Sequence, residues 1–191
     1  MAHVTIIGTG NMGQAIAALA AKGGHSVQAL AHTDTGEAVT GELVVLAVPY
    51  AALTDIAAQR AEQLAGRVVV DITNPVDFET FDSLVVPADG SAAAELAAAL
   101  PQSRVLKAFN TNFAATLASG AVGDVPTTVL VAGDDAQAKQ LLIDVVTSGG
   151  VRAVDAGSLK RARELEAVGF LQLTLAAGEK IAWTAGFAVV S

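Results

Sequence analysis

The sequence VTIIGTGNMG, residues 4–13, places three glycines directly after a short apolar strand. The glycines belong to the pattern G-x-G-x-x-G, formed by Gly8, Thr9, Gly10, Asn11, Met12 and Gly13. In a dinucleotide-binding turn the first glycine permits a tight bend, the second lets the backbone approach a pyrophosphate, and the third packs the helix on the strand. The pattern alone is a weak signal, but its place between a strand and a helix makes it specific. It predicts a pyrophosphate-binding turn, with a glycine turn that binds no ligand as the alternative.

Strand and helix patterns alternate along most of the chain. We expect strands over residues 4–8, 26–31, 43–48, 67–72, 105–109, 127–132 and 151–154, and helices over residues 11–22, 50–64, 91–100 and 135–148. The runs LVVLAV and RVVVDI are continuously apolar, which is typical of strands buried on both faces. This alternation predicts an α/β fold, a doubly wound (Rossmann-like) and mostly parallel sheet.

The end of the chain departs from the alternation. Residues 159–177 form one long helical pattern, and a tail with Trp183 and Phe187 follows over residues 178–191. We therefore expect a dinucleotide-binding domain over residues 1–155. Residues 156–191 are expected to be a helix and tail of the same compact unit, packed on the sheet, where they close a pocket or supply a dimer contact.

The connection after the second expected strand is short. Only eleven residues, His32 to Glu42, separate the strand ending at Ala31 from the next one. A crossover between parallel strands needs a dozen or more residues, so a helix and a further strand do not fit there. We expect the sheet to be abbreviated at this point, which leaves the adenosine end of the cofactor site relatively open.

The same turn bears on the choice between NAD and NADP. NAD-specific folds carry Asp or Glu at the end of the second strand, where it binds the ribose 2′-hydroxyl. Here Leu30 and Ala31 occupy that place, and His32 and Thr33 follow, whose side chains can donate hydrogen bonds to a 2′-phosphate. This favours NADP. Two observations stand against it: a slipped turn would point Asp34 at the ribose, and His32 is almost as well explained as an exposed loop residue.

Composition excludes several classes of function. A net charge of −8 argues against a nucleic-acid partner, and the absence of Cys removes disulfides and thiolate metal sites. The three scattered His residues do not suggest a metal site. The mean hydropathy is high, +0.51, yet every apolar run is broken well before the roughly 20 residues of a membrane span. Because residues 1–9 lack a secretory signal, we expect a cytoplasmic protein. The cluster Lys160, Arg161 and Arg163 with Glu164 and Glu166 is interpreted as a solvated helix face with ion pairs.

Ligands of open α/β sheets bind outside the carboxyl ends of the strands. The expected strand ends here carry small polar residues or Pro: Ala47, Val48, Pro49 and Tyr50; Thr73 and Asn74; Asn110 and Thr111. Three such ends beside a glycine turn predict a nicotinamide pocket, in which amides bind the carboxamide or a second ligand and Tyr50 flanks a ring. No set of catalytic acid and base residues emerges, and hydride transfer between two held rings does not require one.

Seven blocks of the sequence resemble, in order and spacing, the NADP oxidoreductases that act on the deazaflavin coenzyme F420. They are GTGNMGQAIA, GHSV, VVLAVPYAAL, GRVVVDITNP, VLKAFNT, VAGDD and DAGSLKRARELE. The resemblance implies that Gly8 to Gly13 bind the pyrophosphate, that Pro49 and Tyr50 lie along the dinucleotide, and that Asn110 and Thr111 lie near the two rings. It also implies hydride transfer between NADPH and a deazaflavin or flavin-like acceptor.

The chain departs from that family at three places, one of which is the shortened stretch between Ala31 and Leu43. Ala31 and His32 replace the Ser-Arg or similar pair that grips the 2′-phosphate, and Asn110 replaces a His of archaeal members. Two other functions therefore stay open: a small-imine reductase resembling pyrroline-5-carboxylate reductases, and a non-catalytic dinucleotide sensor. The imine reductases add a large helical dimerisation domain, whereas this chain has one long helix and a tail. The expected partners are a small-molecule redox acceptor and a second copy of the chain.

Overall fold

The computed structural model describes residues 1–190 and shows one seven-stranded sheet in the order β2-β1-β3-β4-β5-β8-β9. Every neighbouring pair is parallel except β5 and β8, which are antiparallel. The strands are β1 (His3–Ile7), β2 (Ser26–Leu30), β3 (Leu43–Leu46), β4 (Val68–Asp71), β5 (Arg104–Lys107), β8 (Thr128–Gly133) and β9 (Arg152–Gly157). The predicted mostly parallel, doubly wound α/β fold is confirmed.

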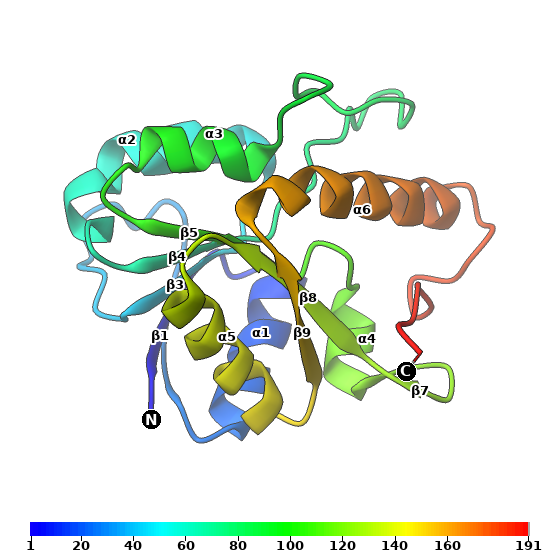
Figure 1. Ribbon diagram of the computed structural model, residues 1–191, viewed down its shortest axis with the longest axis horizontal. Coiled ribbons are helices and arrows are strands. Elements are labelled where there is room, and N and C mark those ends of the chain that lie inside the picture. Colours follow the sequence, from blue (N-terminus) through cyan, green and yellow to red (C-terminus); the bar gives the residue numbers. More distant parts are fainter. Residues whose placement is uncertain (191) are drawn as a thin grey trace.

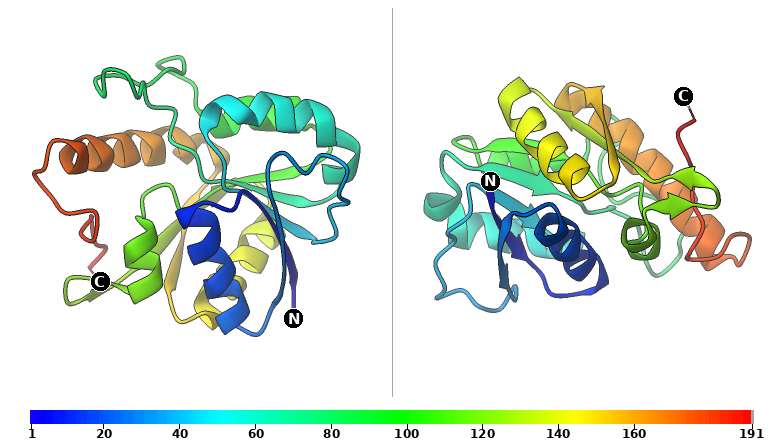
Figure 2. Two further views of the ribbon diagram at one scale, coloured as in Figure 1. Left: turned by 180° about the vertical axis from the view of Figure 1, so that it is seen from behind. Right: turned by 90° about the horizontal axis from the view of Figure 1, so that it is seen from below.

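Helices cover both faces of this sheet (Figures 1 and 2). One face carries α1 (Asn11–Lys22), α4 (Ala114–Ser119) and α5 (Ala136–Ser148). The other carries α2 (Leu53–Leu64), α3 (Ala92–Ala99) and α6 (Ala162–Ala177). Short 3-10 turns, η1 (Tyr50–Ala52) and η2 (Leu159–Arg161), lead into α2 and α6. The C-terminal helix thus packs on the sheet as expected.

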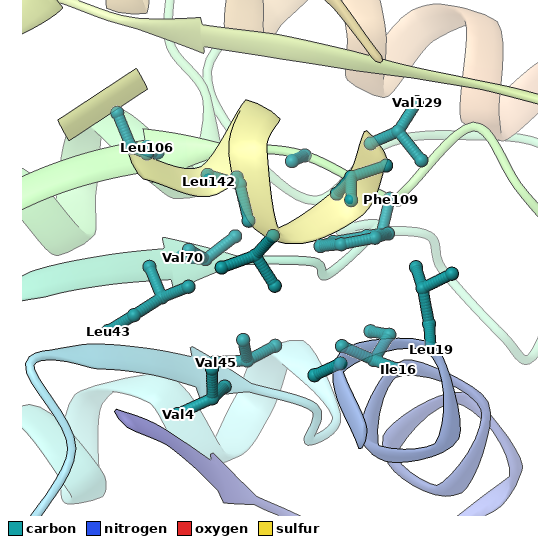
Figure 3. Packing of buried hydrophobic residues seen from close by; sticks show 14 of the residues in the cluster. Val4, Ile16, Leu19, Leu43, Val45, Val70, Leu106, Phe109, Val129 and Leu142 are labelled. Carbon is teal, nitrogen blue, oxygen red and sulfur yellow. The ribbon is translucent and has the colours of Figure 1, made fainter. Parts of the chain in front are cut away.

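Two hydrophobic cores lie on the two faces of the strands. Val4, Val45 and Val70 point toward α1 and α5, where they meet Ile16 and Leu142 (Figure 3). The residues between them in the strands, such as Val44, Leu46 and Val69, face α2 and α3 instead. Since successive side chains of a strand point to opposite faces, both faces of these central strands must be apolar. The unbroken runs LVVL and VVV follow from that requirement.

Several small elements differ from the sequence prediction. Helix α4 and the hairpin of β6 (Ala121–Val122) and β7 (Val125–Pro126) were not expected, and β9 runs three residues further than residue 154. Helix α4 spans six residues, too few for helical periodicity to be recognisable, and it ends at Gly120, which has φ of 74°. The hairpin turns at Gly123, with φ of 59°.

The short connection after β2 is held by two arginines of neighbouring elements. Residues 31–42, all within the described part of the chain, contain neither helix nor strand, so the predicted abbreviation is confirmed. Buried Arg60 of α2 donates to the carbonyl oxygens of Asp34 and Glu37, the latter at 2.9 Å. Arg67 donates to the carbonyl oxygens of Val39, at 2.9 Å, and of Gly41. These guanidinium groups satisfy backbone carbonyls of a connection that has no helix or strand of its own.

Among residues 1–190, no helix combines the length and the apolar character that crossing a membrane requires.

Candidate functional site

The glycine turn is built by backbone approaching backbone. Gly8 has φ of 116°, donates its N–H to the carbonyl of Leu30 at 2.8 Å, and passes so close to β3 that a Cβ would lie 2.0 Å from the carbonyl oxygen of Ala47. A Cβ on Gly13 would lie 2.0 Å from the carbonyl oxygen of Gly8. Only glycine fits these two places, because any side chain there would overlap main-chain atoms. The turn therefore joins the ends of β1, β2 and β3 to the start of α1.

Gly10 has a different environment. It is the N-cap of α1 with an extended backbone, and apart from Gly10 and its two chain neighbours no described atom lies within 4 Å of where its Cβ would be. Because glycine has no side chain, the first N–H groups of α1 have no side-chain cap. Exposed Thr9 and Asn11 flank this helix end. Free N–H groups and the positive end of the helix dipole make it suited to binding a phosphate.

The turn after β2 is exposed and is held by a hydrogen bond within the turn. The N–H of Ala31 donates to the Asp34 carboxylate at 2.9 Å, which directs that carboxylate back at the turn. His32 and Thr33 lie exposed just beyond the strand end. They are accessible to a ligand lying along this edge of the sheet, but neither lines the cavity described below.

The turn after β3 sends its aromatic residue away from the glycines. Ala47 and Val48 pack beside Gly8 and exposed Pro49 starts η1, but the Tyr50 hydroxyl donates to Glu95 of α3 at 2.6 Å. Burial is the main cause that raises the pKa of Tyr50 to about 12, and the hydrogen bond to Glu95 is the second. Tyr50 is therefore a neutral hydrogen-bond donor to α3 at physiological pH. It lines a small hollow between α2 and α3.

A cavity of about 400 Å³ opens at the carboxyl ends of β4 and β5, beside the start of α1. Its lining combines apolar, aromatic and amide side chains: Asn11, Met12, Ile72, Asn74, Phe109, Asn110, Asn112, Phe113, Ala114, Ala115, Leu173 and Trp183. This volume and this mixture of walls are typical of small-molecule sites. Two of the three predicted strand ends, those after β4 and β5, thus meet the start of α1 in one cavity.

Asn74 and Asn110 meet across the cavity floor. The Asn110 amide nitrogen donates to the Asn74 side-chain oxygen at 2.9 Å and to the Leu165 carbonyl of α6 at 2.8 Å. Asn74 in turn donates to the Asn110 backbone carbonyl at 2.9 Å. Helix α6 approaches this pair at Gly169, where a Cβ would lie 2.3 Å from the Asn74 side-chain oxygen. The pair therefore fastens α6 to the strand ends as well as lining the cavity.

Four buried side-chain oxygens in the described part of the chain have no hydrogen-bond partner: those of Thr73, Asn110, Asn112 and Thr128. Two of them, Asn110 and Asn112, belong to cavity-lining residues. The Asn112 amide nitrogen donates to the Thr128 carbonyl at 3.1 Å, which fixes the orientation of its amide. Thr111 is buried, and its backbone carbonyl accepts a bond from Gln172. The floor thus keeps unused acceptor capacity, which is uncommon in a folded interior.

A buried charged cluster that the sequence analysis did not predict lies at the ends of β4 and β5. Lys107 of β5 donates to Asp71 of β4 at 2.8 Å, to Glu166 of α6 at 2.8 Å and to the Thr73 carbonyl at 2.6 Å. All three side chains are at most 1% exposed. Glu166 also accepts from the N–H of Ala92 at 3.0 Å, at the start of α3. The cluster ties the central strands to two helices.

The expected solvated position of Glu166 is wrong, because its carboxylate points inward to Lys107. Burial raises the pKa of Glu166, while Lys107 and the N–H of Ala92 oppose that shift. Only Glu164 forms the expected kind of exposed pair, with Arg161 at 3.6 Å. One signal for the cluster was present in the sequence: Asp71 and Lys107 each interrupt an otherwise apolar run, and they stand opposite one another in the register of β4 and β5.

The glycine turn at the start of α1 and the cavity at the strand ends define a Rossmann-like dinucleotide-binding protein. Residues 26–75 match the family model "NADP oxidoreductase coenzyme F420-dependent". The resemblance to this family that the sequence predicts is confirmed.

Relatives and a solved structure agree with that family. The chain is 34% identical over 132 residues to the F420-dependent NADP reductase of Methanocaldococcus jannaschii, a match that covers 67% of this chain and 59% of that protein. It is 33% identical to the enzyme of the same name from Methanothermobacter marburgensis, over 75% of this chain and 66% of that protein. The chain thus spans about three-fifths to two-thirds of these relatives. A crystal structure of a candidate F420-dependent NADP reductase from Arthrobacter sp. FB24 covers 100% of both chains with a TM-score of 0.84 and 25% identity.

Proposed function

We propose that this chain is an NADP(H)-dependent oxidoreductase that transfers a hydride between NADPH and a deazaflavin of the F420 type or a flavin-like acceptor. The observation that carries the proposal is the continuity of the phosphate-binding turn with the cavity. Asn11 and Met12 belong to the glycine motif and also line the cavity, so a dinucleotide bound at the turn can reach the cavity with its other end. The similarity to F420-dependent NADP reductases supports the same conclusion.

Each predicted residue has a role in this proposal. Gly8, Thr9, Gly10, Asn11, Met12 and Gly13 bind the pyrophosphate at the start of α1. His32 and Thr33 bind the 2′-phosphate at the open edge left by the abbreviated connection. Ala47, Val48 and Pro49 lie along the dinucleotide, with Tyr50 at the margin of that path. Thr73, Asn74, Asn110 and Thr111 surround the nicotinamide end.

The chemistry asks little of the protein beyond positioning. NADPH, when bound, supplies the hydride, which leaves one ring carbon with its electron pair and bonds to a carbon or nitrogen of the second ring. The residues of this chain hold the two rings together, with the Asn74 and Asn110 amides orienting polar ring substituents and the apolar wall of Ile72, Phe109 and Leu173 excluding water. Holding two reactants in contact geometry accounts for a large share of rate acceleration.

The test is a stopped-flow measurement of NADPH absorbance after mixing with oxidised F420, FMN, FAD or a cyclic imine. We expect loss of NADPH absorbance with F420 or a flavin and none with the imine. Turnover of the imine alone would show that the chain is an imine reductase instead. Micromolar NADPH binding without turnover of any acceptor would overturn the oxidoreductase proposal and favour a non-catalytic dinucleotide sensor.

We also propose that the chain forms a homodimer through α6 and the tail. Val168 and Leu171 of α6 are 38% and 51% exposed, and Phe187 of the tail is 44% exposed, so both elements present apolar side chains to solvent. Sedimentation equilibrium should give twice the mass of one chain. A monomer at micromolar concentration would contradict the proposal.

A further inference from the structure

The buried face of α6 is polar at successive turns. Glu166 contacts Lys107, Gly169 contacts the asparagine pair, and Gln172, one turn further along, is only 1% exposed. Both ends of the Gln172 amide are used. Its nitrogen donates to the Thr111 carbonyl at 3.2 Å, and its oxygen accepts from the N–H of Phe187 at 2.9 Å. A buried glutamine is costly unless its amide is bonded, so this position depends on both partners.

The two partners of Gln172 belong to different parts of the site. Thr111 follows Asn110 on the cavity floor, whereas Phe187 lies in the segment that follows α6. That segment, residues 178–190, has Glu179 near its start, with φ of 57°, and drops from the end of α6 toward α4 (Figure 1). Its residues Gly186 and Phe187 come back to Gln172. Gly186 comes so close to Gln172 that a Cβ would lie 3.0 Å from its side-chain oxygen. Gln172 therefore connects the cavity floor to the returning segment.

The returning segment supplies one wall of the cavity. Trp183 packs against Phe113 with ring centroids 5.0 Å apart, and both rings line the cavity. Trp183 remains 52% exposed, so its ring is not explained by burial in a core. An aromatic ring at a cavity wall offers a flat apolar surface, which suits stacking on a planar ligand ring.

We propose that Gln172 is a positioning residue that holds residues 178–190 as the outer wall of the cavity, and that Trp183 contacts the hydride acceptor. The proposal rests on the proposed function. The phosphates of NADPH bind at the start of α1, at a distance from its nicotinamide ring. Because these contacts do not involve the wall, NADPH keeps most of its affinity when the wall is displaced. The acceptor has only the cavity walls, so its binding depends on Trp183.

The first test is Gln172→Met, which keeps the unbranched shape and removes both hydrogen bonds, with Gln137→Met on the exposed face of α5 as the matched control. We expect the KM for the acceptor to rise about tenfold, which corresponds to 1.4 kcal/mol. The Kd for NADPH and the kcat should change by less than about twofold. An unchanged KM for the acceptor would overturn the proposal, as would an equal loss of affinity for NADPH and acceptor.

Trp183 is the only tryptophan of the chain, so its fluorescence reports on the wall without any turnover. In Gln172→Met, we expect acrylamide to quench Trp183 more strongly than in the wild type or in Gln137→Met. Equal quenching would overturn the positioning role whatever the activity. Trp183→Leu, which leaves α6 intact, should raise the KM for the acceptor with the same small effect on NADPH. Absence of turnover in the wild type would instead contradict the proposed function, and the quenching comparison would still decide whether Gln172 holds the wall.

Discussion

The two sides of the cavity are built on different principles. At the glycine turn, Gly8 and Gly13 allow main chains to approach where no Cβ fits. On the α6 side, Lys107, Asn110 and Gln172 bridge separate elements through polar side chains that are buried and bonded. The first side depends on the absence of side chains at two glycines and the second on matched donors and acceptors. Substitutions should therefore damage them in different ways.

The largest effect is expected from Gly8→Ala. The new Cβ would overlap the Ala47 carbonyl, and the φ of 116° is unfavourable for any residue with a side chain. We expect a loss of about 4 kcal/mol in the free energy of unfolding, measured by urea denaturation. Gly10→Ala is the control, because its Cβ meets open space among the described residues. It should cost less than about 0.5 kcal/mol of stability and still weaken NADPH binding. Similar stability losses in both variants would remove the distinction between the two glycines.

Lys107→Met tests the polar side of the comparison. It leaves the Asp71 and Glu166 carboxylates facing one another without their cation, and we expect a loss of about 3 kcal/mol in the free energy of unfolding. Lys139→Met serves as control, since its partner Asp155 is 51% exposed and water screens the pair, which should contribute less than about 1 kcal/mol. Equal effects of the two substitutions would mean that the buried cluster does not hold the helices.

A smaller effect is expected from the pH dependence of Glu166→Gln. The pKa of Glu166 is raised in the folded protein, so folding favours its protonated form. The stabilising contribution of this proton is complete below the ordinary pKa of a glutamic acid and disappears as the pH rises through the raised pKa. The free energy of unfolding of the wild type should therefore decline relative to Glu166→Gln over that range in urea titrations. A constant difference between the two proteins would show that the carboxyl does not titrate abnormally.

The smallest effect is expected at the open edge. His32 is exposed, and its replacement by Ala removes at most one hydrogen bond to a 2′-phosphate. We expect the ratio of NADPH to NADH affinity to fall about fivefold, or about 1 kcal/mol, in fluorescence titrations, with unchanged stability. An unchanged ratio would assign the preference to other residues of the turn.

The same comparison explains how far sequence analysis reaches. The geometry of the glycine turn could be predicted because a tight turn and a close helix contact impose glycine at fixed local spacing. The strand ends at Asn74 and Asn110 were predicted as cavity residues, and the structure places both there. Their bonds to one another and to α6 could not be predicted, since they depend on how distant elements pack.

The buried cluster could not be predicted for the same reason. The tail was expected to close a pocket or supply a dimer contact, but its bond to Gln172 could not be predicted either. Glu166 stands in a run of exposed charges, and nothing local distinguishes it from Glu164. Its inward direction follows from the rotation of α6, which Gly169 and Gln172 help to set through contacts with residues much earlier in the chain. Tyr50 is a further example. Its position after a strand was predicted, but its hydrogen-bond partner, Glu95, lies on a later helix and could not be.

We expect the buried lysine to set an order of folding events during synthesis. β4 and β5 can pair once residue 107 has left the ribosome, but Lys107 then sits at the sheet face without Glu166. Before Glu166 is synthesised, the Lys107 amine has only Asp71 and the Thr73 carbonyl as partners, so we expect α3 to close over it incompletely. Completion of this face therefore waits for α6, and a nascent chain that stalls before residue 166 should remain accessible to proteases and chaperones along β4 and β5.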